Sequence, residues 1–313
     1  MTSPSLRCLI CLVAGFLSLQ LGAARAELRV VATVKPIHAL VAGVMAGAGK
    51  PYLIVKGAAS PHTYAMKPSD AAALQNAQLV FRVGGAFESF LDSAIKNGNA
   101  SAEVIALGKA TGVRTLPYRH GAMWTGTGDH DHDHGSHAGA SFDPHIWLDP
   151  GNAIKMVGAI AQSLGFTYPD KMFQFAQNAA AIAARLQDLQ AEIKATVAPV
   201  RGRPFLVFHD AYQYFETAFG VTAAGAVSLG DSRAPGARRI KALRREIIAR
   251  KVICIFAEPQ FQSRIITTLL EGTNVRRGTL DPIGAKDPVG AGSYFALMRR
   301  NANALVECLA PKG

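Results

Sequence analysis

Beyond residue 26 the sequence has no apolar run long enough to cross a membrane, since such a helix needs about 20 apolar residues. It has four cysteines in all, and only Cys254 and Cys308 lie beyond that point. The motifs HExxH and GxSxG, which are typical of zinc peptidases and of serine hydrolases, do not occur. These absences argue against a membrane-spanning protein and leave a hydrolase as the less favoured alternative.

The first 26 residues have the features of a secretory signal peptide. Arg7 provides a positive start, Leu9 to Leu21 form an apolar run, and Ala24 to Ala26 have the small-x-small pattern of a cleavage site. We therefore expect residues 1–26 to be removed and the rest of the chain to lie outside the cytoplasm, in the periplasm. The residues before Cys8 and Cys11 lack the small pair expected before a lipidated cysteine.

The formal net charge of +11 falls to +9 without Arg7 and Arg25. The positive residues are scattered, except between residues 238 and 251, where they fit the solvated face of one helix. We therefore expect no nucleic-acid partner, and we also expect the protein to be a monomer. Cys254 and Cys308 can form a disulfide in an oxidising compartment, or they can remain two buried thiols.

Residues 27–313 exceed what a single hydrophobic core usually holds, which favours two domains. Short apolar segments alternate with helical patterns, an order that predicts parallel strands covered by helices in an α/β fold. In the first half, strands are expected near 28–34, 52–55, 79–83 and 104–107, with helices from Pro36 and near 68–76, 87–96 and 150–164. In the second half, strands are expected near 205–208, 252–256 and 275–280, with helices near 212–219, 237–250, 265–271 and 294–309.

Two segments interrupt this alternation. Residues 117–141 contain five histidines and five glycines and show hardly any periodicity, so we expect a long loop in the first lobe. Residues 169–199 have no internal glycine or proline and repeat apolar residues on one face, which predicts a rod of about 45 Å. The predicted organisation is an N-terminal lobe over 27–165, an interlobe helix over 166–199 and a C-terminal lobe over 200–313, with similar small parallel sheets.

Four potential metal ligands fall where the predicted strands and loops lead into a cleft between the lobes. In open α/β sheets, ligands bind beyond the carboxyl ends of the strands. His62 and His145 come from the first lobe, and His209 and Asp281 from the second. Three imidazoles and one carboxylate suit Zn²⁺, whereas a site with two carboxylates would suit Mn²⁺ better. Asp281 precedes a proline and can instead be a turn residue.

Two other polar residues, His38 and Glu258, are not expected to be metal ligands. His38, on the first helix, fits a packed or exposed helix position better than a place in the cleft. Glu258 also follows a strand, and it can accept a hydrogen bond from a ligand N–H or simply begin a helix.

At these positions the chain resembles the metal-specific solute-binding proteins of ABC importers, and within them the zinc branch, ZnuA. The resemblance rests on SPHTYAMKPSD, DPHIWLDP, LVFHDAYQYF and LDPIGA, together with the histidine-rich insert, and it runs from about Val31 to the C-terminus. It implies a periplasmic receptor, not an enzyme, that binds Zn²⁺ in the cleft and delivers it to a membrane permease driven by an ATPase. A related receptor for manganese or iron is the alternative, disfavoured by His209.

The resemblance also bears on the fourth ligand and on the cysteines. Some zinc-branch relatives have an acidic residue directly before the first histidine, where this chain has Pro61, so either Asp281 or a water must complete the coordination. The pair Cys254 and Cys308 resembles the disulfide of the zinc branch.

The histidine-rich segment has a second predicted role, which is to hold another ion loosely and pass it to the main site. The alternative is a spacer whose histidines merely tolerate metal. The residues expected to bind this ion are Asp129, His130, Asp131, His132, Asp133, His134 and His137.

Overall fold

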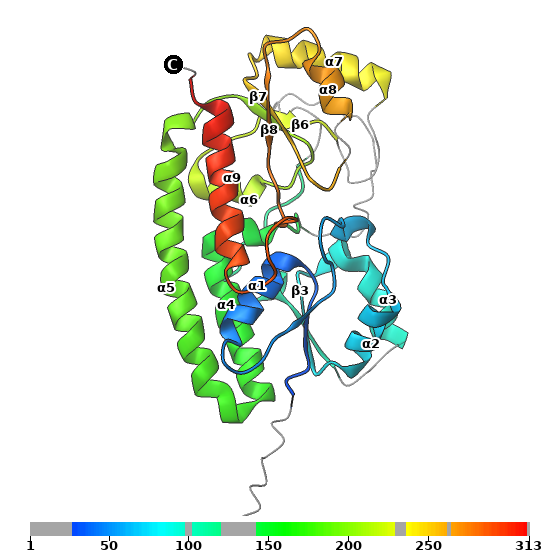
Figure 1. Ribbon diagram of the computed structural model, residues 1–313, viewed down its shortest axis with the longest axis vertical. Coiled ribbons are helices and arrows are strands. Elements are labelled where there is room, and N and C mark those ends of the chain that lie inside the picture. The colour runs from blue at the N-terminus through cyan, green and yellow to red at the C-terminus, as the bar shows by residue number, and fades with distance from the viewer. Residues whose placement is uncertain (1–26, 98–101, 120–141, 229–235, 262–263, 312–313) are drawn as a thin grey trace, which may run out of the picture.

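The computed structural model describes residues 27–97, 102–119, 142–228, 236–261 and 264–311. Strands and helices alternate along the chain and form two small sheets, one near each end of the molecule (Figure 1). This confirms the predicted α/β fold with two similar lobes and parallel sheets. The exact lobe boundaries at residues 165 and 200 stay a prediction.

The first sheet has the strand order β2-β1-β3-β4, and all neighbours are parallel. Its strands β1 and β3 are entirely buried, as expected for parallel strands covered on both faces. The strands are β1 (Val30–Ala32), β2 (Tyr52–Leu53), β3 (Leu79–Arg82) and β4 (Glu103–Ala106), and the helices between them are α1 (Lys35–Val44), α2 (Pro68–Asn76) and α3 (Ser89–Asn97).

The second sheet repeats this arrangement with the order β6-β5-β7-β8, again parallel throughout. Its strands are β5 (Phe205–Val207), β6 (Gly225–Ala226), β7 (Cys254–Ala257) and β8 (Arg276–Thr279). The helices of this half are α6 (Gln213–Phe219), α7 (Ala237–Ala249), α8 (Arg264–Leu270) and α9 (Ser293–Leu309). Strand β6 was not predicted, because two small residues give no apolar run.

Two helices connect the sheets, α4 (Pro150–Thr167) and α5 (Met172–Val197). Helix α5 has 26 residues, about 39 Å, and it runs along one side of both lobes (Figure 1). It packs against α1, α4 and α9. Its buried face repeats every three or four residues and comprises Phe175, Ala179, Ile182, Leu186, Leu189, Ile193 and Val197.

The close packing of α1 on α5 depends on a glycine. A Cβ at Gly43 would lie 2.7 Å from Ile182 Cδ1, so a larger residue there would force the Ile182 side chain to shift. One hydrophobic cluster continues from the first sheet through these helices to α9 and the second sheet. Among the described helices, none is both long enough and apolar enough to cross a bilayer.

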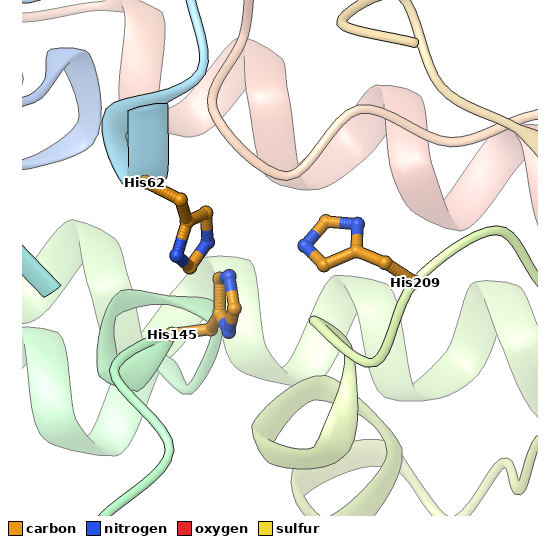
Figure 2. A group of neighbouring side chains, drawn as sticks. All are labelled: His62, His145 and His209. Atoms are coloured by element: carbon orange, nitrogen blue, oxygen red, sulfur yellow. The ribbon is translucent and has the colours of Figure 1, made fainter. Parts of the chain in front are cut away.

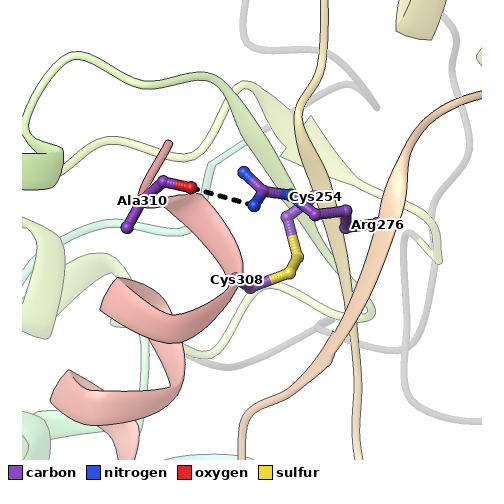
Figure 3. Close-up of a disulfide and its surroundings, with 4 residues drawn as sticks. All are labelled: Cys254, Arg276, Cys308 and Ala310. Atoms are coloured by element: carbon purple, nitrogen blue, oxygen red, sulfur yellow. Dashed lines mark hydrogen bonds between the residues drawn. A yellow bond between two sulfur atoms is a disulfide. The ribbon is translucent and has the colours of Figure 1, made fainter. Parts of the chain in front are cut away.

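A disulfide joins Cys254 on β7 to Cys308 on α9, which confirms the predicted pairing. Nearby, Arg276 of β8 donates a hydrogen bond of 2.9 Å to the Ala310 carbonyl beyond the end of α9 (Figure 3). Both contacts fix the last helix against the second sheet.

Candidate metal centre

Three histidines from separate parts of the chain lie close together, with their rings turned toward a common point (Figure 2). His62 lies in a short 3-10 turn, η1 (Pro61–Thr63), and is half-buried. His145 precedes the turn η4 (Ile146–Leu148), which leads into α4, and His209 follows β5; both are buried. The sequence predicted this convergence from their positions after strands and before a helix.

The local fold around His62 is held by one carboxylate. Asp70, on α2, accepts hydrogen bonds from Tyr64 at 2.7 Å, from Tyr52 at 2.9 Å and from the Lys67 amide at 3.1 Å. The loop that carries His62 is therefore tied at its far end to both β2 and α2.

The three imidazoles are close enough to share one ion. One ring nitrogen from each lies within 4.8 Å of those of the others, and the ring centroids are 5.3 to 6.0 Å apart. A tetrahedral zinc ion requires nitrogens about 3.3 Å apart. The rings must therefore move closer together when the ion binds. Among the described residues, this is the only such group of histidine, cysteine or acidic side chains.

Two buried carboxylates fix the orientation of two of these rings. His145 Nδ1 lies 2.7 Å from Asp143 Oδ1, and His209 Nδ1 lies 2.8 Å from Glu258 Oε1. With each carboxylate ionised, Nδ1 carries the proton and Nε2 is the nitrogen available to a metal. Burial raises the pKa of Asp143 to about 7, and burial also raises the pKa of Glu258.

Asp281, expected as a possible metal ligand, does not line the pocket. Its carboxylate accepts hydrogen bonds from the amides of Ile283 at 3.2 Å, Gly284 at 2.9 Å and Ala285 at 2.6 Å. The Gln260 side chain donates a fourth, at 2.9 Å. Asp281 therefore does not belong to the group of histidines. Its carboxylate instead stabilises the turn after β8 through these hydrogen bonds.

The pocket around the histidines is largely apolar. The Phe87 ring lies 4.8 Å from the His62 ring, and the Phe261 ring lies 5.3 Å from the His209 ring. Gln260 and Ile283 also line the pocket. Sequence reasoning missed these residues, because a phenylalanine or glutamine beside a strand carries no signal of its own.

Several hydrogen bonds cross between the two halves near this pocket. Trp147 Nε1 donates to the Pro282 carbonyl at 2.7 Å. Lys35 Nζ donates to the Gly284 carbonyl at 2.6 Å and to those of Ala285 and Asp287 at 3.0 and 3.1 Å. Burial lowers the pKa of this lysine. The loop that contains Asp281 is thus held from within its own lobe and from the other.

A further contact links Arg119, near the start of the predicted histidine-rich loop, to the second lobe. Arg119 donates to Asp210, at 3.0 Å from its Nε to Oδ2, and to Glu216, at 2.8 Å from its Nη1 to Oε2. Asp210 directly follows His209, so this ion pair lies next to the candidate ligands. The two acidic partners raise the pKa of Arg119 despite its burial.

The remaining predicted site residues lie elsewhere. His38 is buried on α1, with its Nε2 3.0 Å from the Pro51 carbonyl, and it does not line the pocket. The seven residues predicted to hold a second ion, Asp129, His130, Asp131, His132, Asp133, His134 and His137, lie outside the described residues, as does the predicted signal segment 1–26.

Comparison with known proteins identifies similar chains. The family model described as "Zinc-uptake complex component A periplasmic" (ZnuA) matches residues 30–308. The chain is 40% identical over 304 residues to the high-affinity zinc uptake system protein ZnuA of Brucella abortus (strain 2308), covering 90% of this chain and 91% of that one. It is 35% identical over 310 residues to the protein of the same name in Paracoccus denitrificans, covering 91% and 93%.

The fold also matches solved structures. The periplasmic zinc-binding protein TroA of Treponema pallidum superposes with a TM-score of 0.75 at 25% identity, covering 90% of this chain and 98% of that one.

Proposed function

We infer that this protein, which belongs to the ZnuA family of periplasmic zinc-uptake components, holds its Zn²⁺ on His62, His145 and His209. It is a zinc-binding receptor for zinc uptake and not an enzyme. The observation that carries the ligand assignment is that these three rings, drawn from both halves of the chain, place one nitrogen each within 4.8 Å of one another.

The donor set fits zinc. Neutral imidazole nitrogen is a good ligand for Zn²⁺, and a four-coordinate zinc site commonly has three protein ligands and one water. Because the Asp281 carboxylate is held by the amides of its own turn and does not line the pocket, we propose that a water takes the fourth position. The apolar walls of Phe87 and Phe261 exclude other water and strengthen the electrostatic attraction between the ion and its ligands.

Alanine substitution of each histidine tests the assignment. The three variants are His62→Ala, His145→Ala and His209→Ala, and zinc affinity is measured in competition with a chelator. Loss of an outer hydrogen-bonding partner of a metal ligand lowers affinity about 10–100-fold, and loss of a ligand should lower it further. His38→Gln serves as the matched control, since that histidine is buried but does not line the pocket. A variant that kept wild-type affinity would remove its histidine from the ligand set.

Metal analysis of protein purified from periplasm without added metal tests the cargo itself. We expect zinc at one tightly bound ion per chain, with little manganese or iron, because the proposed shell has no carboxylate ligand. Protein that carries manganese instead would contradict the assignment.

We further propose that the receptor acts as a monomer and passes zinc to an inner-membrane permease driven by an ATPase. Support comes from the family, whose description is that of a periplasmic component of a zinc-uptake complex. Residues 1–26 are proposed as the signal peptide that directs the chain to the periplasm, on the sequence pattern alone. Mass determination of the exported protein, with a first residue near Glu27, tests the cleavage.

A further inference from the structure

Gln260 connects Asp281 to the wall of the metal pocket. It lies three residues beyond β7 and lines the same pocket as the three histidines. Its Nε2 donates a 2.9 Å hydrogen bond to Asp281 Oδ1. The Asp281 carboxylate is in turn held by the amides of its own turn, so the acceptor for Gln260 is fixed in place.

This contact determines which way the Gln260 amide faces. A carboxylate can only accept hydrogen bonds, so the NH₂ end of the amide must face Asp281 and the oxygen must face away from it. Within the part of the chain that the structure describes, Gln260 Oε1 is buried and receives no hydrogen bond. A buried acceptor of this kind calls for an explanation, because nearly all such atoms in folded proteins have a partner.

We propose that Gln260 Oε1 accepts a hydrogen bond from the water that completes the coordination of Zn²⁺, and that Asp281 acts through Gln260 by orienting its amide. This rests on the proposed function. A water bound to zinc on three histidines has two hydrogens to donate, and an amide oxygen in the wall of a small apolar pocket is a suitable acceptor. Gln260 is thus a positioning residue for the fourth ligand.

The proposal has a consequence for metal selectivity. Manganese favours carboxylate ligands, whereas zinc accepts a shell of imidazoles and water. The amide at position 260 offers the fourth position a neutral oxygen, while the Glu258 carboxylate binds His209 Nδ1 and the Asp281 carboxylate binds the amides of its own turn. The neutral Gln260 amide beside the water therefore favours zinc over manganese.

Gln260→Met removes the acceptor at similar side-chain length and tests the proposal. With the His₃ ligands intact, zinc affinity should fall about 10-fold, as for other outer partners of a metal site. Gln260→Glu should raise the affinity for Mn²⁺ relative to Zn²⁺. Gln174→Leu is the control, because Gln174 lies on α5 and its amide binds the Ala46 carbonyl away from the pocket.

A spectroscopic readout separates positioning from a general structural effect. In Co²⁺-loaded protein, the visible spectrum follows deprotonation of the bound water as the pH rises. An acceptor favours water over hydroxide, so Gln260→Met should move the midpoint to lower pH, while Gln174→Leu should leave it unchanged. If Gln260→Met fails to fold, as judged by thermal unfolding of the metal-free protein, Gln260→Ala replaces it.

The outcomes distinguish this proposal from the function on which it depends. Wild-type protein that bound no zinc on its histidines would overturn the proposed function. Wild-type protein that bound zinc, together with a Gln260 variant of unchanged affinity and unchanged Co²⁺ midpoint, would overturn only the role of Gln260.

Discussion

At the scale of single residues, the site combines neutral ligands with buried acids that hold them. Asp143 and Glu258 each bind the Nδ1 atom of a histidine and are themselves buried. Burial penalises their charged forms and raises the pKa of both carboxylates, and a nearby positive charge favours the anions. A zinc ion on the far side of each imidazole supplies that charge, which couples metal binding to proton release.

Asp143→Asn should reveal this coupling. Below its pKa of about 7 the Asp143 carboxyl keeps a proton in the zinc-free protein, and zinc binding must release it. Wild-type affinity should therefore fall as the pH drops through this value. The asparagine variant should bind zinc about 10–100-fold more weakly at high pH but lose affinity less steeply on acidification. Chelator competition at a series of pH values measures both curves, and parallel curves would contradict the coupling.

The residue scale also shows where prediction from sequence ended. His62, His145 and His209 were located because each follows a strand or precedes a helix at the same edge of the fold. Asp281 was placed by the same logic, with a turn role before Pro282 as the alternative, and its carboxylate accepts hydrogen bonds from three amides of that turn. Gln260 was missed because its proposed role depends on its contact with Asp281, which follows the neighbouring strand β8.

At the scale of elements, most helices and strands followed from periodicity. Helix α2 matches its predicted range of 68–76, since Pro68 fixes its start, and α5 lies within the predicted 169–199. Strand β1 is shorter than the predicted 28–34, because its parallel pairing with β2 and β3 extends only over Val30–Ala32. Sequence reveals where apolar residues lie, while strand ends depend on where neighbouring backbones stop pairing.

The disulfide between β7 and α9 should contribute to stability more than to binding. It closes a segment with a sequence separation of 54, and a loop of that size restricts the unfolded chain by about 4 kcal/mol in the chain-entropy account. Replacing both cysteines with alanine should lower the free energy of unfolding by about 2–4 kcal/mol in denaturant titrations. Zinc affinity measured below the transition should stay close to that of wild type.

The reduced wild-type protein is the control for this substitution. It should unfold at the same lowered denaturant concentration as the double variant. Unchanged stability in both would show that the link between Cys254 and Cys308 constrains little.

The histidine-rich segment is expected to bind an additional zinc ion weakly and to leave the affinity of the tight site unchanged. Deleting residues 120–139 should remove a weakly bound ion while the three-histidine site keeps its affinity, as isothermal titration would show. A second variant of unchanged length, with His130, His132, His134 and His137 replaced by serine, separates metal binding from a spacer role. Loss of the tight site in the serine variant would contradict this division between the two sites.

At the scale of the whole molecule, the two halves are held together on several sides. Helix α5 packs against α1, α4 and α9, and Trp147 and Lys35 cross to the loop that follows β8. Arg119 crosses to α6 through Glu216. Because these contacts cross between the two halves, we expect zinc to bind with only a modest rearrangement of the lobes.

Solution scattering tests this rigidity. The radius of gyration of zinc-free and zinc-loaded protein should agree within error, with chelator-treated and reloaded samples as the matched pair. A clear contraction on loading would show that the lobes hinge and would contradict this rigidity.

The most direct measurement is anomalous diffraction at the zinc absorption edge from crystals of the loaded protein. We expect one strong peak between the lobes, about 2.0–2.1 Å from a nitrogen of each of His62, His145 and His209, with a water as the fourth neighbour. A peak bound by fewer than these three rings, or located elsewhere in the chain, would contradict the assignment of the zinc site.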